Sequence, residues 1–177
     1  MNHISIITIF LLSLFPKISY GFNGPFILGQ DSVIVGRSNG NVLIDKNSSA
    51  ASVLLVLNKE HTLNIDKEYS VCFHKVQLKE APEGIYEIYV SPEKLDKTKL
   101  SSKSPFFVNL LDTYGLDNRK DLCINATRNL KSIAESNKFV STCFVAILFR
   151  SNVLPNKGVS KNVGKICIEQ IRLIAYD

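Results

Sequence analysis

The sequence predicts an all-β fold, an antiparallel β-sandwich of the jelly-roll kind with one short helix. Short segments of alternating apolar and polar residues recur along the chain, with turn-forming residues between them. Two segments, 69–78 and 165–176, shift their alternation by one place and then resume it, which is the pattern of a β-bulge. Helical periodicity appears only over 128–136, so the chain lacks the intervening helices of a parallel sheet.

The expected elements follow one another as short strands separated by turns. The strands span 32–36, 41–44, 52–57, 69–78, 85–90, 106–111, 122–126, 140–149 and 166–174. The turns have the sequences SNGN at 38–41, APEG at 81–84, SPEK at 91–94 and LPNKG at 154–158. We assign Gly36 and Gly40 to a hairpin turn. The helix over 128–136 has Leu130, Ile133 and Ala134 on one face.

The N-terminus is typical of a secretory signal peptide. A short apolar run over 6–14 is followed by Pro16 and by the small residues Ser19 and Gly21. The run is much shorter than the roughly 20 apolar residues that span a bilayer, so a signal peptide is preferred to a membrane anchor. We place cleavage after Gly21, which leaves a single β-sandwich domain over 22–177. The expected protein is secreted, outside the cell or in the lumen of the secretory pathway, and has no membrane attachment after cleavage.

The charge of the chain does not favour a nucleic-acid partner. The formal net charge is +5, and it falls to +4 when one lysine, Lys17, leaves with the signal peptide. Lysines in the segment 94–103 are interleaved with acidic residues and serines rather than with aromatic residues. A surface that binds nucleic acid needs aromatic residues among its cationic ones. We interpret these lysines as solvated surface and expect no nucleic acid to bind.

The cysteines are candidates for disulfides, because a secreted protein folds in an oxidising compartment. The four are Cys72, Cys123, Cys143 and Cys167. Their spacing is not that of a metal site, and the sequence does not choose among the three pairings. Cys72 and Cys167 precede the phase shift by the same distance in their strands, so we favour a bridge between these two. Buried free thiols are the open alternative.

Two asparagines lie in acceptor sequences for N-glycosylation. Asn47 begins the sequence NSS in a polar turn, and Asn125 begins NAT. We expect Asn47 to be the better acceptor, because Asn125 is predicted to be partly buried in a strand.

No group of residues forms a recognisable catalytic site. His74 lies at a predicted bulge, where a side chain can be re-aimed toward a metal or a proton, but an ordinary surface histidine is favoured. The serines of 101–104 lack a His and Asp arrangement. Three glutamates are interpreted as solvated surface, and three aspartates are too dispersed for a calcium site. These acidic residues are Glu80, Glu83, Glu87, Asp112, Asp117 and Asp121. We expect no enzyme activity, no metal and no cofactor.

Aromatic residues are the main candidates for a binding surface. In the strand 85–90, Tyr86 and Tyr89 point to opposite faces, as do Phe106 and Phe107 in the strand 106–111. One face belongs to the core. The other packs beneath a loop, which we prefer, or is exposed to a partner. Tyr86, Tyr89 and Phe107 are therefore the binding-surface candidates.

Six segments, taken in order, resemble strands of a known domain. They are SVCFHKVQL, IYEIYVS, PFFVNLL, LCINATRNLKSI, FVAILFR and ICIEQIRLI. They resemble the C-terminal domain of plant-type polyphenol oxidases, the tyrosinase and catechol oxidase group, from about residue 27 to residue 174. In that family a copper domain comes first. Here only His61 and His74 remain after cleavage, too few histidines for a type 3 copper pair.

The resemblance implies a shielding role, because in the full-length enzymes this domain packs over the copper site and blocks substrate entry. We expect a secreted, non-catalytic protein-interaction or shielding domain, whose extracellular partner is a copper oxidase bound in trans. The alternative is a secreted carbohydrate- or lipid-binding module that uses the aromatic surface, and a hydrolase is least favoured. An exposed patch would favour protein binding, whereas an aromatic-lined groove would favour a ligand.

Overall fold

The computed structural model describes residues 31–59, 62–113, 116, 120–136, 140–151 and 162–176. The predicted signal peptide, the turn 154–158, His61 and Asp117 lie outside these residues. The strands are β1 (Ser32–Ser38), β2 (Val42–Ile44), β3 (Ala50–Leu57), β4 (Glu68–Glu80), β5 (Gly84–Ser91), β6 (Phe107–Leu111), β7 (Lys120–Asn125), β8 (Thr142–Ser151), β9 (Lys165–Ile168) and β10 (Gln170–Tyr176). A 3-10 turn, η1 (Lys97–Lys99), and one α-helix, α1 (Thr127–Ser136), complete the described elements.

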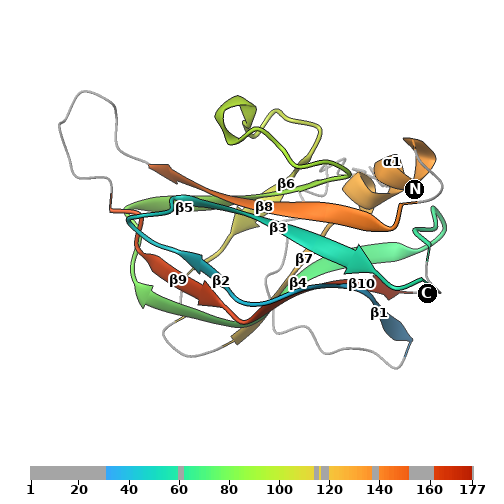
Figure 1. Cartoon of the computed structure of the whole chain (residues 1–177), viewed down its shortest axis with the longest axis horizontal. Helices are drawn as coiled ribbons and strands as arrows, with labels where there is room; N and C mark the ends of the chain where they lie inside the picture. Colours follow the sequence, from blue (N-terminus) through green and yellow to red (C-terminus); the bar gives the residue numbers. More distant parts are fainter. Residues whose placement is uncertain are drawn as a thin grey trace, which may run out of the picture.

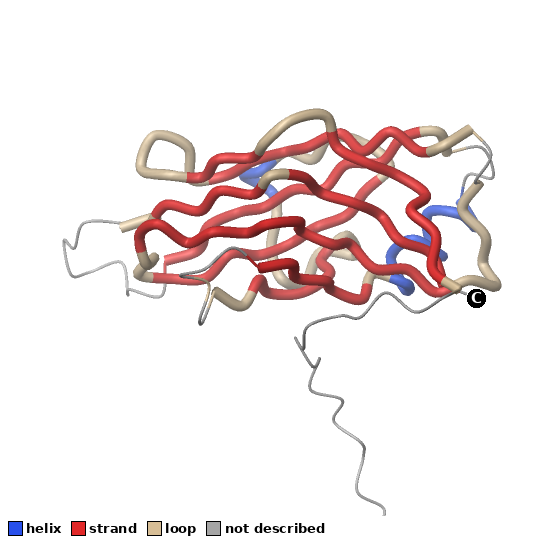
Figure 2. Tube along the Cα trace, turned by 90° about the horizontal axis from the view of Figure 1, so that it is seen from below, coloured by secondary structure: helices blue, strands red, loops and turns tan. Residues whose placement is uncertain are grey.

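The strands form one antiparallel, continuously hydrogen-bonded sheet that folds over into two layers. Its order is β2-β9-β4-β10-β1-β3-β8-β5-β6, with β7 paired to β4 off this path. In Figure 1, β3, β5 and β8 lie in the upper layer, and β2, β9, β4 and β10 lie in the lower one. Figure 2 shows the strands running along the length of the molecule. The predicted antiparallel β-sandwich with one short helix is confirmed.

The core lies between the two layers. Alternation along the strands places every second side chain inside, and those with no exposed surface include Ile44, Leu55, Phe73, Ile88, Ile147, Ile166 and Leu173. Burial of such aliphatic and aromatic side chains stabilises the fold by about 1.5–3 kcal/mol each. The regular alternation read from the sequence therefore has its physical cause in this two-layer core.

The helix α1 closes the end of the sandwich that carries the C-terminal strand end (Figures 1 and 2). Leu130, Ile133 and Ala134 are its buried residues, which confirms the predicted apolar face. Hydrogen bonds hold both the backbone and the side chain of its first residue, Thr127. The Thr127 N–H donates to Asn125 Oδ1 at 3.0 Å, and the Thr127 hydroxyl accepts from Tyr69 N–H at 2.8 Å. No helix in the described part of the chain is long and apolar enough to cross a membrane.

Both predicted bulges are present. In β4, the register with β7 shifts between Phe73 and Val76, and Lys75 has a φ of +49°. At the second site, Glu169 lies between β9 and β10 and belongs to neither strand. Each irregularity lets the core-facing alternation change phase, so the side chains on both sides of it still point inward.

The two bulges lie side by side. Gln170 is opposite His74 on one side of them, and Cys167 is opposite Gln77 on the other. The His74 carbonyl accepts a hydrogen bond from the Glu169 N–H at 3.1 Å. At this level β4 changes its partner from β10 to β9, so the bulges mark the bend of the sheet.

The predicted hairpin at Gly36 and Gly40 is wrong. Gly36 lies inside β1, where a Cβ atom would come within 2.7 Å of Leu57 Cδ2. Gly40, with a φ of +86°, is the turn residue. The strands that it joins do not pair with each other, since β1 lies between β10 and β3 whereas β2 pairs with β9. The short connection between β1 and β2 is therefore not a hairpin, because it joins two strands that pair with different neighbours in the sheet.

Candidate functional site

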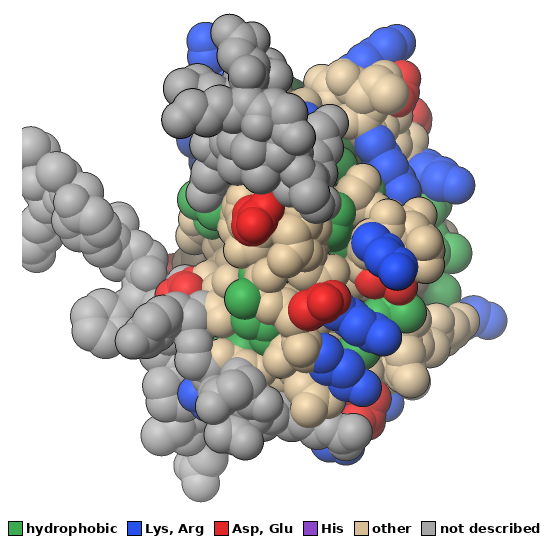
Figure 3. All heavy atoms as spheres, turned by 90° about the vertical axis from the view of Figure 1, so that its left-hand side faces the viewer, with side chains coloured by type: hydrophobic (Ala, Val, Ile, Leu, Met, Phe, Trp, Pro, Cys, Tyr) green, Lys and Arg blue, Asp and Glu red, His purple; other side chains and the backbone are tan. Residues whose placement is uncertain are grey.

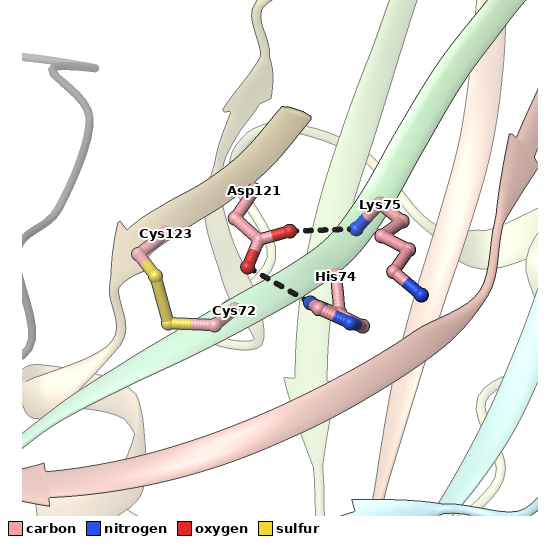
Figure 4. Close-up of a disulfide and its surroundings, with 5 residues drawn as sticks. All are labelled: Cys72, His74, Lys75, Asp121 and Cys123. Carbon is pink, nitrogen blue, oxygen red and sulfur yellow. Dashed lines mark hydrogen bonds and ion pairs between the residues drawn. A yellow bond between two sulfur atoms is a disulfide. The ribbon is translucent and has the colours of Figure 1, made fainter. Parts of the chain in front are cut away.

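The structure joins Cys72 to Cys123, not to Cys167 as we favoured. Cys72 on β4 lies directly opposite Cys123 on β7, with an S–S distance of 2.04 Å (Figure 4). Each cysteine precedes its bulge by the same number of residues, but β4 runs antiparallel to β9 and β10. The two cysteines therefore lie on opposite sides of the facing bulges. Cys72 lies opposite Arg172, whereas Cys167 lies beyond the bend, opposite Gln77.

The other two cysteines are free thiols. Cys143 is buried in the core and Cys167 is half-buried on β9. Burial raises the pKa of the Cys143 thiol to about 12, so it remains protonated and unreactive. Among the described residues, no group of three or more His, Cys, Asp or Glu side chains is placed to hold a metal ion.

A carboxylate holds the bulge of β4. Asp121 Oδ2 is 2.8 Å from His74 Nδ1, and Asp121 Oδ1 accepts the Lys75 N–H at 2.8 Å (Figure 4). The Lys75 ammonium forms an ion pair with Glu169 at 3.0 Å. One carboxylate thus binds two consecutive residues of the bulge, and an ion pair links the two bulges.

The contact between Asp121 and His74 was not predicted from the sequence, because the two residues are 47 positions apart. The contact can be predicted once Cys72 is known to pair with Cys123. In an antiparallel pair, the residue two places after Cys72 faces the residue two places before Cys123, and these are His74 and Asp121.

The electrostatics of this cluster favour an ionised carboxylate. Burial raises the pKa of Asp121, but hydrogen bonds from Lys75 N–H and His74, with the charges of His74 and Arg172, together bring it below its ordinary value. A His–Asp pair needs a nucleophile beside it to act in acyl transfer. The sulfurs next to it in Figure 4 are bonded to each other and offer no thiolate. What the geometry shows is a clamp on the bulge.

We expect Asp121→Ala to lower the free energy of unfolding by about 1 kcal/mol at neutral pH, because the Lys75 N–H and His74 lose their acceptor. The folded-state pKa of Asp121 is lowered, so its carboxylate stabilises the fold above its ordinary pKa near 4. This contribution disappears as the pH falls through the folded-state value. Urea unfolding of variant and wild type should therefore converge below about pH 4. Asp66→Ala, at an exposed turn residue, is the control, and a difference that does not change with pH would contradict the assignment.

The predicted aromatic surface is not exposed, so Tyr86 and Tyr89 are wrong as binding-surface residues. Tyr86 is fully buried in the core, where its hydroxyl donates to the Val163 carbonyl at 2.5 Å. Tyr89 is fully buried on the opposite face and meets Phe107 edge-on at a ring distance of 5.6 Å. Phe107 itself is half-buried. The preferred interpretation, an aromatic face packed beneath a loop, is confirmed.

That loop spans 92–106, and we call it the covering loop. Its residues Leu95, Leu100 and Phe106 pack on the outer face of β3, β5 and β8. It contains η1 and is drawn in yellow-green at the top of Figure 1. Lys97 donates to the Ala50 carbonyl at 3.1 Å, which ties the loop to β3.

A partly buried ion pair anchors the covering loop. Glu87 Oε2 accepts hydrogen bonds from the Tyr89 hydroxyl at 2.5 Å and from Arg150 Nε at 2.8 Å. The Arg150 guanidinium also donates to the carbonyl of Leu100 in the loop. Glu87 is buried, so its interpretation as solvated surface is wrong. Because Tyr89 and Arg150 both bind the Glu87 carboxylate and Arg150 also binds the loop, this cluster is a structural anchor.

Next to the covering loop, the outer face of β3 and β8 carries exposed apolar side chains. Leu54 and Val56 are 41% and 45% exposed. Phe144, directly opposite Leu54, is half-buried. We call Leu54, Val56 and Phe144 the apolar strip. Arg37 lies opposite Val56 and is exposed, so a cationic side chain borders the strip.

The two glycosylation candidates are both exposed. Asn47 lies in the turn that is closed by the bridge between Asp45 and Ser48. Asn125, expected to be partly buried, is instead exposed at the end of β7, and its side-chain oxygen accepts the Thr127 N–H.

Figure 3 shows one end of the molecule, where Lys and Arg side chains lie among Asp and Glu side chains instead of forming one cationic surface.

The fold is that of one part of the plant polyphenol oxidases. Among solved structures, that of latent apple tyrosinase matches 77% of this chain with a TM-score of 0.50 and 14% identity. A recombinantly expressed latent aurone synthase, also described as a polyphenol oxidase, matches 76% with a TM-score of 0.47 and 8% identity. The chain spans about a quarter of those proteins, 27% and 26%. Neither a protein-family model nor a curated protein matches the sequence. The resemblance predicted from the sequence is confirmed at the level of the fold.

Proposed function

We propose that the protein is a secreted, non-catalytic β-sandwich that binds another protein through the apolar strip. The observation that carries this proposal is the exposure of Leu54 and Val56 beside Phe144 on one sheet face. Contiguous exposed apolar side chains mark contact surfaces in soluble proteins. An apolar centre with a polar rim, here Arg37, is the composition of a protein–protein interface.

The kind of partner is suggested by the likeness in fold. The tyrosinase and the aurone synthase are both described as latent, and this fold forms about a quarter of each. The resemblance implies that this region shields the copper site in those enzymes. A separate chain of the same fold would supply that shield in trans, so we propose an extracellular copper oxidase as the partner. The Cys72–Cys123 disulfide supports an oxidising compartment for such an encounter.

The test is affinity capture from the extracellular fraction of the organism that secretes the protein, followed by a phenol-oxidase assay. We expect a copper oxidase to be recovered and its activity to fall when the protein is added. The variant Leu54→Lys with Val56→Lys should lose both effects. Ile65→Lys is the matched control, because Ile65 is 49% exposed but lies in the turn before β4.

Two results would overturn this proposal. One is equal recovery of the oxidase by the strip variant and by Ile65→Lys. The other is recovery of no protein together with retention on glycan or lipid supports, which would favour a carbohydrate- or lipid-binding module that uses a surface other than Tyr86 and Tyr89.

N-glycosylation at Asn47 provides a separate test of secretion. Produced in a eukaryotic secretory cell, the protein should appear in the medium with an N-glycan, and Asn47→Gln should remove most of the mass shift that a glycan-cleaving enzyme causes. Asn125→Gln is the comparison and should have the smaller effect, because the Asn125 side-chain oxygen is bonded to Thr127. Retention inside the cell, or secretion with no shift in any variant, would contradict the expectation for Asn47.

A further inference from the structure

We propose that a hollow on the outer face of β2, β9 and β4 binds a sugar-sized carboxylate of the uronic acid class. The hollow has a volume of about 230 Å³ and opens to solvent. Its lining includes Asn41, Lys75, Gln77, Lys79, Cys167 and Glu169. We call it the lysine hollow. It does not include the apolar strip, so this ligand site is independent of the proposed protein partner.

The strand register places the polar lining on one face. Gln77 on β4 lies opposite Cys167 on β9, and Leu43 on β2 lies opposite Cys167 from the other side. Their neighbours Val76 and Ile166 are fully buried in the core. The alternation of the strands therefore turns Gln77 and Cys167 outward, toward the hollow.

The bulge aims a lysine into this hollow. Lys75 has a φ of +49°, a left-handed conformation that a residue with a long side chain rarely adopts. Such local strain persists where the surroundings enforce it, and here Asp121 holds the Lys75 N–H. Figure 4 shows the Lys75 backbone facing Asp121 while its side chain extends away. The Lys75 ammonium already holds a carboxylate of the rim, that of Glu169, at 3.0 Å.

The remaining donors of the hollow are available to a ligand. Across the described part of the chain, the side chains of Asn41, Gln77 and Lys79 have neither a hydrogen-bond nor an ion-pair partner. Two ammonium groups against one carboxylate leave the hollow positive, which favours an anion. The two amides can donate to and accept from hydroxyl groups. A carboxylate that carries neighbouring hydroxyl groups satisfies both kinds of donor.

The size of the hollow limits the ligand to a single sugar unit. Pockets for drug-sized molecules have volumes of roughly 300–1,000 Å³, so this hollow is smaller than those. It is open to solvent, so the rest of a polymer would extend outside it. Free sugar acids and uronate units of a polysaccharide share the chemistry that this site recognises.

The test is titration calorimetry of the purified protein with galacturonate, with galactose as the uncharged comparison at equal ionic strength. We expect saturable binding of galacturonate and none of galactose. Lys79→Gln should weaken binding about tenfold, the change expected for one charge-assisted hydrogen bond. Lys103→Gln changes the net charge equally but lies in the covering loop, and it should leave the affinity unchanged.

Further measurements distinguish a polysaccharide from a free sugar acid as the source of the ligand, and they define the results that would overturn the proposal. Galacturonate oligomers that bind more tightly than the monomer would identify a polymer as the source, and equal binding per unit would identify the free sugar acid. The proposal is overturned if no saturable binding is found, if Lys79→Gln and Lys103→Gln weaken binding equally, or if only a Glu-rich peptide binds. The apolar-strip variant should bind galacturonate normally, which keeps this test apart from that of the protein partner.

Discussion

Replacement of Cys72 and Cys123 by alanine is expected to lower the free energy of unfolding by about 4 kcal/mol. The disulfide closes a loop with a sequence separation of 51 residues, which includes β5, β6 and the covering loop. Cross-linking a loop of that length removes conformational entropy from the unfolded chain, and the chain-entropy relation gives about 4 kcal/mol at 25 °C. Urea unfolding under oxidising conditions measures the difference.

Two controls show whether the loss comes from the cross-link. Cys167→Ala removes a half-buried free thiol and should change the free energy of unfolding by less than about 0.5 kcal/mol. A reductant should bring the wild type close to the double variant and leave the variant itself unchanged. If the reductant destabilises both proteins equally, the loss in the variant comes from packing and not from the disulfide.

The second large effect is expected from Arg150→Met. This change leaves the carboxylate of Glu87 buried without its cation and removes the donor to the Leu100 carbonyl. Breaking a fully buried pair costs about 3–5 kcal/mol. Because Arg150 is 39% exposed, we expect the lower value of about 2–3 kcal/mol here. Urea unfolding gives the free energy, and hydrogen exchange of the amides in 92–106 should show faster opening of the covering loop.

A double-mutant cycle tests the cause. Glu87→Gln combined with Arg150→Met should destabilise the protein by less than the sum of the single changes, because the unpaired charge is removed together with its partner. Arg128→Met on the exposed face of α1 is the matched substitution and should be nearly neutral. Additive single effects, or unchanged exchange in the covering loop, would show that Arg150 does not anchor it.

Much of the fold can be predicted from the sequence because alternation is a local property. The phase shifts after Phe73 and after Ile168 appear in the chain itself, and a local pattern is enough to predict a bulge. The apolar face of α1 follows in the same way from its periodicity. Strand pairing is not local, and the error at Cys72 shows this. Which cysteine lies opposite depends on β7 joining the edge of β4, and nothing in the two segments encodes that pairing.

The candidate sites were harder to predict for the same reason. The segment 50–57 is apolar on both faces, so its pattern does not say which face remains uncovered. The covering loop packs over Ala50 but does not reach Leu54. How far the loop extends along β3 therefore decides which residues form the apolar strip. Glu87 was misjudged because its partner Arg150 is 63 residues away. Long-range contacts of this kind determine both burial and exposure.

The two facing bulges restrict how the chain length can change in this part of the protein. Phe73 lies opposite Ile171 before the bend, and beyond it Gln77 lies opposite Cys167, so both strands carry the same number of residues between these pairs. Deleting Lys75 alone would place inward-facing residues of β4 opposite outward-facing residues of β9. Deleting Lys75 and Glu169 together would keep the pairs aligned. Insertions and deletions at this corner are therefore tolerated only when both strands change by the same amount.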